Sequence, residues 1–251
     1  MSDKTFYSDN VYWNEYWKSE NRQEEVFLFA ELFEKNIVAP KGASYMEVGG
    51  APGSIMSYMY KKYSFSVSTI DFCDREIISA FLDSAGVKDY EIFSNDFCEF
   101  DVNVHSRKYD VVSSWGVVEH FSLDMAAKII DKQKKMVKKG GYIIVELPNI
   151  RFFNWLLYYF MNKDLLAIHN LNVMDLAFLR EEVQKDGFEI VYGDYYLTSL
   201  FQYNQTNAYL QKHTSILKLF KMANSIMKKL KINDIPNRLF SPYIVFIAQR
   251  K

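Results

Sequence analysis

Short apolar runs bounded by turn residues alternate along this chain with longer segments in which apolar residues recur at helical spacing. The short runs predict strands at residues 44–48, 65–71, 89–94, 109–115, 141–147, 188–196 and 242–249. The helical spacing predicts helices over residues 24–37, 53–63, 75–86, 122–138 and 173–186. Strands and helices that alternate in this way are typical of a sheet covered by helices, so the pattern predicts an α/β fold.

Two helix ends are marked by residue type. Lys138 and Lys139 place cations in the expected last turn of a helix, and Gly140 and Gly141 follow them. The segment Asp186-Gly187-Phe188 repeats this arrangement before the sixth predicted strand. We therefore expect the two preceding helices to end at these points.

Length and charge limit the class of protein. A chain of 251 residues fits one α/β domain with a substantial core, and its 30 basic residues nearly cancel its 31 acidic ones. Nothing in that balance requires a nucleic-acid partner. With only two cysteines, a disulfide framework or a zinc cluster is not expected.

No internal repeat or low-complexity linker divides the chain, so we expect a single domain over residues 1–251, with an N-terminal helical cap over 1–40 and a helical insert over 197–240. The polar start lacks the apolar core of a signal peptide. The longest apolar run, Trp155 to Met161, is too short to span a bilayer. These features predict a soluble cytoplasmic protein.

The segment from Ser44 to Ser54 carries the clearest functional signal. A strand there runs into an acidic residue and a glycine-rich turn, where backbone can approach a ligand closely. A dinucleotide fingerprint requires Gly-x-Gly-x-x-Gly, but counting from Gly49 places Ala51 and Ser54 at the second and third glycine positions. The turn predicts a nucleotide-type cofactor site of another kind.

The pattern Glu47-x-Gly49-x-Ala51-x-Gly53 resembles the signature of class I S-adenosylmethionine (SAM) methyltransferases, with alanine at the middle glycine. From about residue 24 onward, the order of motifs resembles the small-molecule branch of this family. The resemblance implies a doubly wound, seven-stranded, mostly parallel sheet whose last strand is antiparallel beside the sixth, and SAM as the cofactor. It also implies that the loop, with Gly50, packs against the amino-acid end of SAM while Glu47 orients the loop and the methionine ammonium.

The second predicted strand ends in Asp71, which lies 24 positions after Glu47. A carboxylate there can accept both ribose hydroxyl protons, and we count the adjacent Phe72 with the cofactor residues. A helix N-cap is the alternative role, although Asp74 lies closer for it. After the third strand, the resemblance places Asp96 against the adenine amine and Phe97 against the ring, although Asn95-Asp96 alone indicates only a turn.

The fourth strand leads to the expected acceptor side. The resemblance implies that Ser114 and Trp115 flank the methionyl part of SAM, and that Glu119 and His120 face the acceptor. Histidine suits proton abstraction because its ordinary pKa is about 6.5. Alternatively, Glu119 and His120 cap the next helix or form a hydrogen bond with each other. Ubiquinone-pathway members with a metal carry a further Glu where this chain has Gly116, so no metal site is predicted.

His169 is the third catalytic candidate. Many relatives have a histidine just before the helix that ends in Gly-Phe, near the acceptor pocket, and His169 precedes the predicted helix over 173–186. A helix cap or a surface position is the alternative.

Three further segments have open interpretations. Four aromatic residues predict an N-terminal helix that either packs on the core or closes over SAM: Tyr12, Trp13, Tyr16 and Trp17. The aromatic run over 151–160 fits an acceptor pocket, a core helix or a dimer surface. Residues 205–239 carry seven cations and one anion among apolar residues at helical spacing. That pattern predicts an amphipathic basic helix, which is a solvated face, an anionic-acceptor site or a membrane contact.

We therefore predict a SAM-dependent O-methyltransferase that acts on a small molecule such as a sugar, a nucleotide-linked sugar or a surface-glycan precursor. The alternatives are an N-methyltransferase, a non-catalytic SAM-binding scaffold and an RNA 2′-O-methyltransferase. The loop over 49–53 resembles the heat-shock ribosomal-RNA enzymes, but Trp115 and Pro148-Asn149 stand where those enzymes place a catalytic Asp and Lys. Nucleic acid is therefore the less favoured acceptor, and the oligomeric state is left open.

Overall fold

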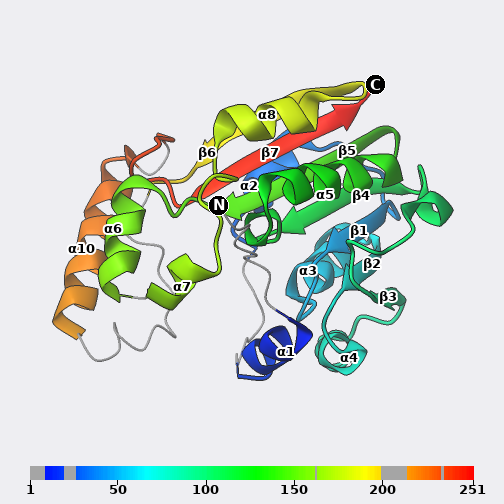
Figure 1. Ribbon diagram of the computed structural model, residues 1–251, viewed down its shortest axis with the longest axis horizontal. Coiled ribbons are helices and arrows are strands. Elements are labelled where there is room, and N and C mark those ends of the chain that lie inside the picture. Colours follow the sequence, from blue (N-terminus) through cyan, green and yellow to red (C-terminus); the bar gives the residue numbers. More distant parts are fainter. Residues whose placement is uncertain (1–8, 20–26, 162, 199–213, 233–234) are drawn as a thin grey trace.

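The computed structural model describes residues 9–19, 27–161, 163–198, 214–232 and 235–251, and its centre is one seven-stranded sheet (Figure 1). The strands are β1 (Ser44–Val48), β2 (Ser66–Asp71), β3 (Tyr90–Ser94), β4 (Tyr109–Trp115), β5 (Val137–Pro148), β6 (Phe188–Tyr196) and β7 (Tyr243–Arg250). Their order in the sheet is β3-β2-β1-β4-β5-β7-β6.

The pairing confirms the expected mixed sheet. Strands β1 to β5 pair in parallel, whereas β7 is antiparallel to both of its neighbours, β5 and β6. The central strands are apolar on both faces, as a sheet covered by helices on both sides requires.

Helices cover both faces of the sheet, and the buried residues form a separate core cluster on each face. On one face, α5 (Leu123–Met136) and α8 (Leu176–Gln184) bury residues such as Ile130 and Leu179. On the other, α2 (Ala30–Asn36), α3 (Ser54–Tyr63) and α4 (Arg75–Ser84) bury residues such as Met56 and Leu82. The helices between β1 and β3 thus lie opposite the helix between β4 and β5, which makes the sheet doubly wound.

The remaining elements lie outside this double layer. They are α1 (Asn10–Ser19), η1 (Val102–His105), η2 (Val118–His120), α6 (Phe152–Met161), α7 (Lys163–Ala167) and α10 (Thr214–Lys229). Figure 1 shows α6, α7 and α10 beyond the carboxyl ends of β4 and β5. In the part of the chain that the structure describes, no helix combines the length and apolar character needed to cross a membrane.

The predicted helix over 122–138 was too long at its C-terminus. Helix α5 ends at Met136, and Val137 already pairs with Tyr109 in the sheet. Lys138 therefore lies in β5, where its Nζ binds the Asp110 carboxylate at 2.9 Å instead of lying in the last turn of the helix. Tertiary pairing decided a boundary at which the local sequence favoured helix.

Two other predictions fall partly outside the described residues. Of the predicted helix over 24–37, residues 24–26 lie outside them, and α2 begins only at Ala30. Of the basic segment over 205–239, residues 205–213 and 233–234 lie outside them, while α10 confirms a helix within the remainder.

Candidate active site at the carboxyl ends of the strands

The order of the strands reverses between β1 and β4. From β1 the chain continues to β2 and β3 on one side, and from β4 it continues to β5 on the other. In open α/β sheets, ligands bind in the crevice outside the carboxyl ends of the strands at such a point. The turns that leave β1 and β4 there both contain a glycine with positive φ, Gly49 at 74° and Gly116 at 68°.

The first turn is packed so closely that side chains are excluded at two positions. A Cβ on Gly49 would lie 2.5 Å from Val117 Cγ2, and one on Gly50 would lie 2.3 Å from Thr69 Oγ1. These glycines bring the β1 turn down between the end of β2 and the turn after β4. Only glycine fits at both positions, because Val117 and Thr69 already fill the space that a Cβ would need.

Asp71 ties the end of β2 to this turn. Its Oδ2 accepts a hydrogen bond from the Ala51 N–H and its Oδ1 accepts one from the Cys73 N–H, both at 2.8 Å. Burial raises the pKa of Asp71, and the backbone N–H groups act in the opposite direction. The Cys73 side chain and the Phe72 backbone also donate to this carboxylate. Asp74, and not Asp71, occupies the N-cap position of α4, although its side chain makes no cap hydrogen bond.

Glu47 lies in a buried polar network under the first turn. The Tyr45 hydroxyl donates to Glu47 Oε2 at 3.2 Å and accepts from Ser113 Oγ at 2.6 Å and from Trp115 Nε1 at 3.2 Å. The Glu47 carbonyl accepts from Thr69 Oγ1 at 2.9 Å. Alternate residues of β1 and β4 thus place Glu47 and Trp115 on the same face of the sheet.

The structure separates other predicted cofactor residues from this network. The Ser114 hydroxyl lies on the opposite face of β4 from Trp115, where it donates to Gln133 of α5 at 3.4 Å. Phe97 is buried in the core cluster under α5, and Asp96 Oδ1 accepts from the Cys98 N–H at 2.8 Å. Phe72 is half-buried directly after Asp71. Their roles toward the cofactor stay predictions.

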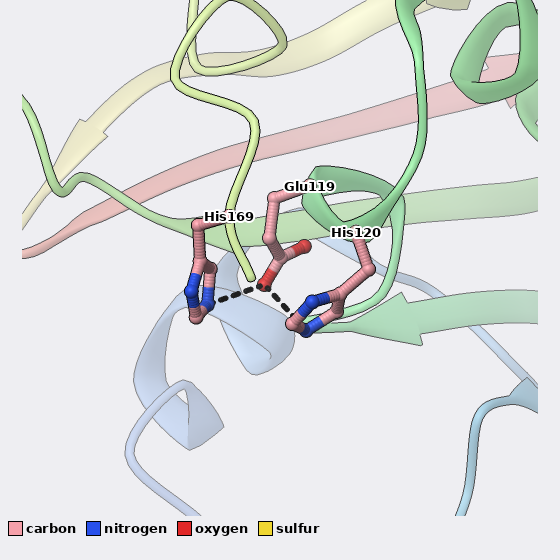
Figure 2. Close-up of side chains that lie close together, drawn as sticks. All are labelled: Glu119, His120 and His169. Atoms are coloured by element: carbon pink, nitrogen blue, oxygen red, sulfur yellow. Dashed lines mark ion pairs between the residues drawn. The ribbon is translucent and has the colours of Figure 1, made fainter. Parts of the chain in front are cut away.

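The three catalytic candidates lie together just after β4 (Figure 2). Glu119 Oε1 lies 3.9 Å from His120 Nε2 and 4.0 Å from His169 Nε2, and the two imidazole centroids are 4.6 Å apart. Glu119 and His120 come from η2, and His169 comes from the loop before α8. We call these three residues the acceptor-side cluster.

Burial sets the protonation of the acceptor-side cluster. It raises the pKa of Glu119 to about 8, because its carboxylate is shielded from water. Burial and the proximity of His169 lower the pKa of His120 to about 3. His120 is therefore neutral and Glu119 is protonated near neutral pH when nothing is bound.

Asn170 joins the loop that carries His169 to η2, which carries Glu119 and His120. The Asn170 N–H donates to the Glu119 carbonyl at 2.7 Å, and Asn170 Nδ2 donates to the Phe121 carbonyl at 2.8 Å. These bonds join the His169 loop to η2 across about fifty residues of sequence, so the distance between His169 and Glu119 is fixed by backbone contacts.

Sequence reasoning missed three residues that complete these arrangements, namely Tyr45, Ser113 and Glu146. Tyr45 and Ser113 belong to the Glu47 network, and the two-residue period of the strands could have indicated them. Trp13, one of the four aromatic residues of the predicted N-terminal helix, contacts His120 edge to face with ring centroids 5.0 Å apart. Glu146 is a buried acid on β5, level with Trp115, and an acid within an apolar strand was the available signal.

Comparison with known proteins agrees with this geometry. The model of a methyltransferase domain family matches residues 19–192 of the chain. A search of curated proteins found no match. The chain belongs to this methyltransferase family.

Solved structures share the fold at low sequence identity. A candidate sarcosine dimethylglycine methyltransferase from Galdieria sulphuraria has a TM-score of 0.61 and 14% identity, over 89% of this chain and 83% of that one. Phosphoethanolamine N-methyltransferase 2 from Haemonchus contortus, in complex with S-adenosyl-L-methionine, has a TM-score of 0.58 and 13% identity, over 99% of this chain and 58% of that one. Geranyl diphosphate C-methyltransferase from Streptomyces coelicolor A3(2) has a TM-score of 0.58 and 8% identity, over 88% of this chain and 77% of that one.

The protein is an enzyme of the class I SAM-dependent methyltransferases, and its cofactor is SAM, as the sequence predicted. The chemistry of the crevice suits this cofactor. Glycines at 49 and 50 let the β1 turn pack closely at the switch point, and the buried carboxyl groups of Asp71 and Glu47 lie beside it, where hydroxyl and ammonium groups of SAM can be recognised.

Proposed function

We propose that this methyltransferase transfers the methyl group of SAM to a hydroxyl oxygen of a small molecule that binds beside the acceptor-side cluster. One observation carries the proposal. Glu119, His120 and His169 converge within 4.8 Å of one another at the end of β4, beside the crevice that the strand order defines. A buried cluster of titratable groups next to a cofactor crevice is a place where a proton can be taken up.

The residues divide the work between alignment and proton removal. SAM supplies a methyl group bound to a positively charged sulfur. As the acceptor oxygen forms its bond to the methyl carbon, the carbon–sulfur bond breaks and the hydroxyl proton leaves to an imidazole of the cluster. His169 is the preferred proton acceptor, because burial lowers the pKa of His120 and makes it a weak base. Alignment of oxygen, carbon and sulfur supplies most of the rate enhancement.

The cofactor end of the crevice is assigned to the residues around the first turn. Asp71 accepts the ribose hydroxyls, Glu47 orients the turn and the methionine ammonium, and Trp115 lies beside the methionyl part. This assignment is supported by their position at the carboxyl ends of β1, β2 and β4. Trp13 covers His120 from α1, which supports a role for the N-terminal helix as a cap over the reacting groups.

A sugar, a nucleotide-linked sugar or a surface-glycan precursor is our preferred acceptor class. Helix α10 supports an anionic acceptor, because Lys218, Lys221, Lys228 and Lys229 are all exposed on it. The same helix also exposes Leu219, Met222 and Ile226, and Leu230 is exposed directly after it, which supports contact with a membrane surface that carries such an acceptor.

N-methylation is the second candidate, and one observation favours it. Glu119 and Glu146 are buried carboxyl groups, and within the described residues neither has a Lys or Arg partner. An amine acceptor would supply a positive charge there. RNA is less favoured, because Asn149, near the position of the lysine in the ribosomal-RNA enzymes, is buried and donates to the Ser241 carbonyl at 2.7 Å.

Incubation of the full chain with isotopically labelled SAM and separate pools of sugar phosphates, nucleotide sugars and amines tests the proposal. Mass spectrometry of the products identifies the methylated atom. We expect label on oxygen, and label on nitrogen would replace the preferred reaction with the second candidate. SAM binding without turnover on any pool would favour the scaffold alternative.

A further inference from the structure

The three donor atoms of the acceptor-side cluster are arranged as metal ligands are. Glu119, His120 and His169 each offer one ligand atom, all within 4.8 Å of one another, and all three residues are buried. Donors at about 2.1 Å around a tetrahedral ion lie about 3.4 Å apart, so the present separations of 3.9 and 4.0 Å need only a small contraction.

The His120 ring is held in the orientation that a metal ligand needs. His120 Nδ1 lies 2.9 Å from the carbonyl oxygen of Ile168, which can only accept, so Nδ1 carries the proton and Nε2 keeps its lone pair. That lone pair is on the side of Glu119 Oε1. A ligating histidine commonly donates its other N–H to a backbone carbonyl in this way.

The charges around the cluster lack a permanent cation. Glu119 is 1% exposed and Glu146 is 5% exposed. Burial, and to a smaller extent the nearby Glu119, raises the pKa of Glu146. Among the described residues, Glu119 Oε2 has no hydrogen-bond partner, and Glu119 Oε1 lies 3.9 Å from His120 Nε2 and 4.0 Å from His169 Nε2. Buried carboxylates are normally paired with a cation or bound to a metal.

Gly116 leaves one side of the cluster open. A Cβ there would lie 3.4 Å from Glu119 Oε1, so a side chain at this position would enter the space beside the carboxylate. Because glycine has no side chain, that space is free for a fourth ligand such as the acceptor. In the sequence, Gly116 argued against a metal because it replaces a glutamate. In the structure, the same glycine leaves a coordination position open.

We propose that Glu119, His120 and His169 bind one divalent transition-metal ion, with an open coordination position that faces the crevice. Two imidazoles and one carboxylate suit ions such as Zn²⁺, whereas Mg²⁺ prefers oxygen ligands. The consequence for catalysis rests on the proposed function. A hydroxyl bound to the ion would lose its proton more readily, and the proton would pass to solvent water. With the ion bound, water would thus replace His169 as the proton acceptor, and the histidines would hold the ion instead.

Co²⁺ titration of the metal-stripped full chain, without SAM or acceptor, tests the binding directly. The visible absorption of bound Co²⁺ reports its donor atoms and coordination number. We expect one saturable Co²⁺ per chain with tetrahedral or five-coordinate absorption, displaced by Zn²⁺. His120→Asn, His169→Asn and Glu119→Gln should each lose this absorption. His105→Asn is the matched control, because His105 is a buried histidine of η1 that contacts Phe93 and Phe100.

Three outcomes overturn the proposal: no saturable absorption in the wild type, equal absorption in the cluster variants, or equal competition by Mg²⁺. Circular dichroism and SAM affinity of each variant show whether it folds. If a variant fails to fold, Zn²⁺-induced stabilisation of the wild type against that of His105→Asn decides instead, and absence of stabilisation counts against the site. Failure of methyl transfer with intact Co²⁺ binding would overturn the proposed function and leave this inference standing.

Discussion

Buried acidic residues lie at the carboxyl ends of β1 and β2 and just after β4, but they differ in how many hydrogen bonds their carboxyl groups accept. Both oxygens of Asp71 accept backbone hydrogen bonds, and Glu47 accepts from Tyr45. Glu119, by contrast, has an oxygen without a hydrogen-bond partner among the described residues, and its other oxygen lies 3.9 and 4.0 Å from nitrogens of two histidines. The carboxylates of the first region are held in place by the protein before a ligand arrives, whereas Glu119 in the second region lacks, within the described residues, a partner that a ligand could supply.

From this difference we infer that the ends of β1 and β2 bind the cofactor and that the end of β4 takes part in the reaction. A preformed carboxylate costs little to reorganise when SAM binds, which suits tight and constant recognition. A buried carboxyl oxygen without a hydrogen-bond partner favours the binding of any ligand that supplies that partner. Such a group is suited to the acceptor, whose protonation changes during the reaction. We therefore expect substitutions in the two regions to have separable effects.

The largest effect is expected at the acceptor-side cluster. His169→Ala should lower turnover by roughly 10² to 10⁴, because it removes either the proton acceptor or a ligand of the ion. SAM affinity should stay close to that of the wild type. Steady-state kinetics with calorimetric titration of SAM measures both quantities, and an equal loss of SAM affinity would mean that the cluster is structural.

A smaller effect is expected at Asp71. Asp71→Ala should weaken SAM binding by roughly 1.5 to 3 kcal/mol, which is the usual contribution of a hydrogen bond to a charged group. Isothermal titration should show this loss, with nicotinamide cofactors silent for both proteins. Asp71→Asn keeps the shape and one acceptor oxygen, so it should lose less. Unchanged affinity in Asp71→Ala would make the ribose assignment wrong.

The basic helix should produce a still smaller effect. Replacement of Lys218, Lys221, Lys228 and Lys229 by Gln should raise the apparent KM for an anionic acceptor a few-fold and flatten its salt dependence, because charge steering is screened over about 8 Å at physiological salt. Folding should survive, since these side chains are exposed. Vesicle sedimentation separates the membrane alternative. If neither KM nor vesicle binding changes, α10 is a solvated face.

The smallest effect is expected at an ion pair outside both regions. Lys134 Nζ donates to Asp186 Oδ2 at 2.6 Å, and this hydrogen bond lowers the pKa of Asp186. Because the folded-state pKa lies below the unfolded value of about 3.9, the stabilisation is complete above that value and is lost as the pH falls through the folded-state pKa. The Asp186 side chain is 67% exposed, so solvent screening keeps the contribution small.

Asp186→Asn checks this prediction by thermal unfolding at several pH values. Asn is well tolerated at the positive φ of 62° that Asp186 adopts. The difference in Tm between wild type and variant should shrink as the pH falls below about 4. Turnover and SAM affinity should not change at neutral pH. A constant difference in Tm across the pH range would contradict the ion-pair explanation.

Most of the fold was readable from the sequence because local pattern and tertiary environment agree. The bounds of β1, β4 and β6 match the predicted ranges 44–48, 109–115 and 188–196, since each apolar run is delimited by turn residues. The end of α5 was not readable. Lys138 joins the sheet through the pairing of Val137 with Tyr109 and its own bond to Asp110, and neither contact is local.

The candidate site was readable only in part, for a similar reason. Asp71 follows from its place at the end of a strand, and the turn at Gly49 follows from its own residues. The proximity of Glu119 and His169 depends on Asn170, which connects two loops far apart in the sequence, so only family resemblance indicated it. The partnership of Glu146 with this cluster depends on strand order, which no local pattern contains.

A structure of the full chain with S-adenosylhomocysteine bound tests the central claim most directly. That claim is that the ends of β1 and β2 hold the cofactor while the end of β4 receives the acceptor. We expect the ribose hydroxyls to lie within hydrogen-bonding distance of Asp71. The sulfur should be directed toward Glu119, His120 and His169. A ribose bound elsewhere, or a sulfur directed away from these three residues, would contradict it.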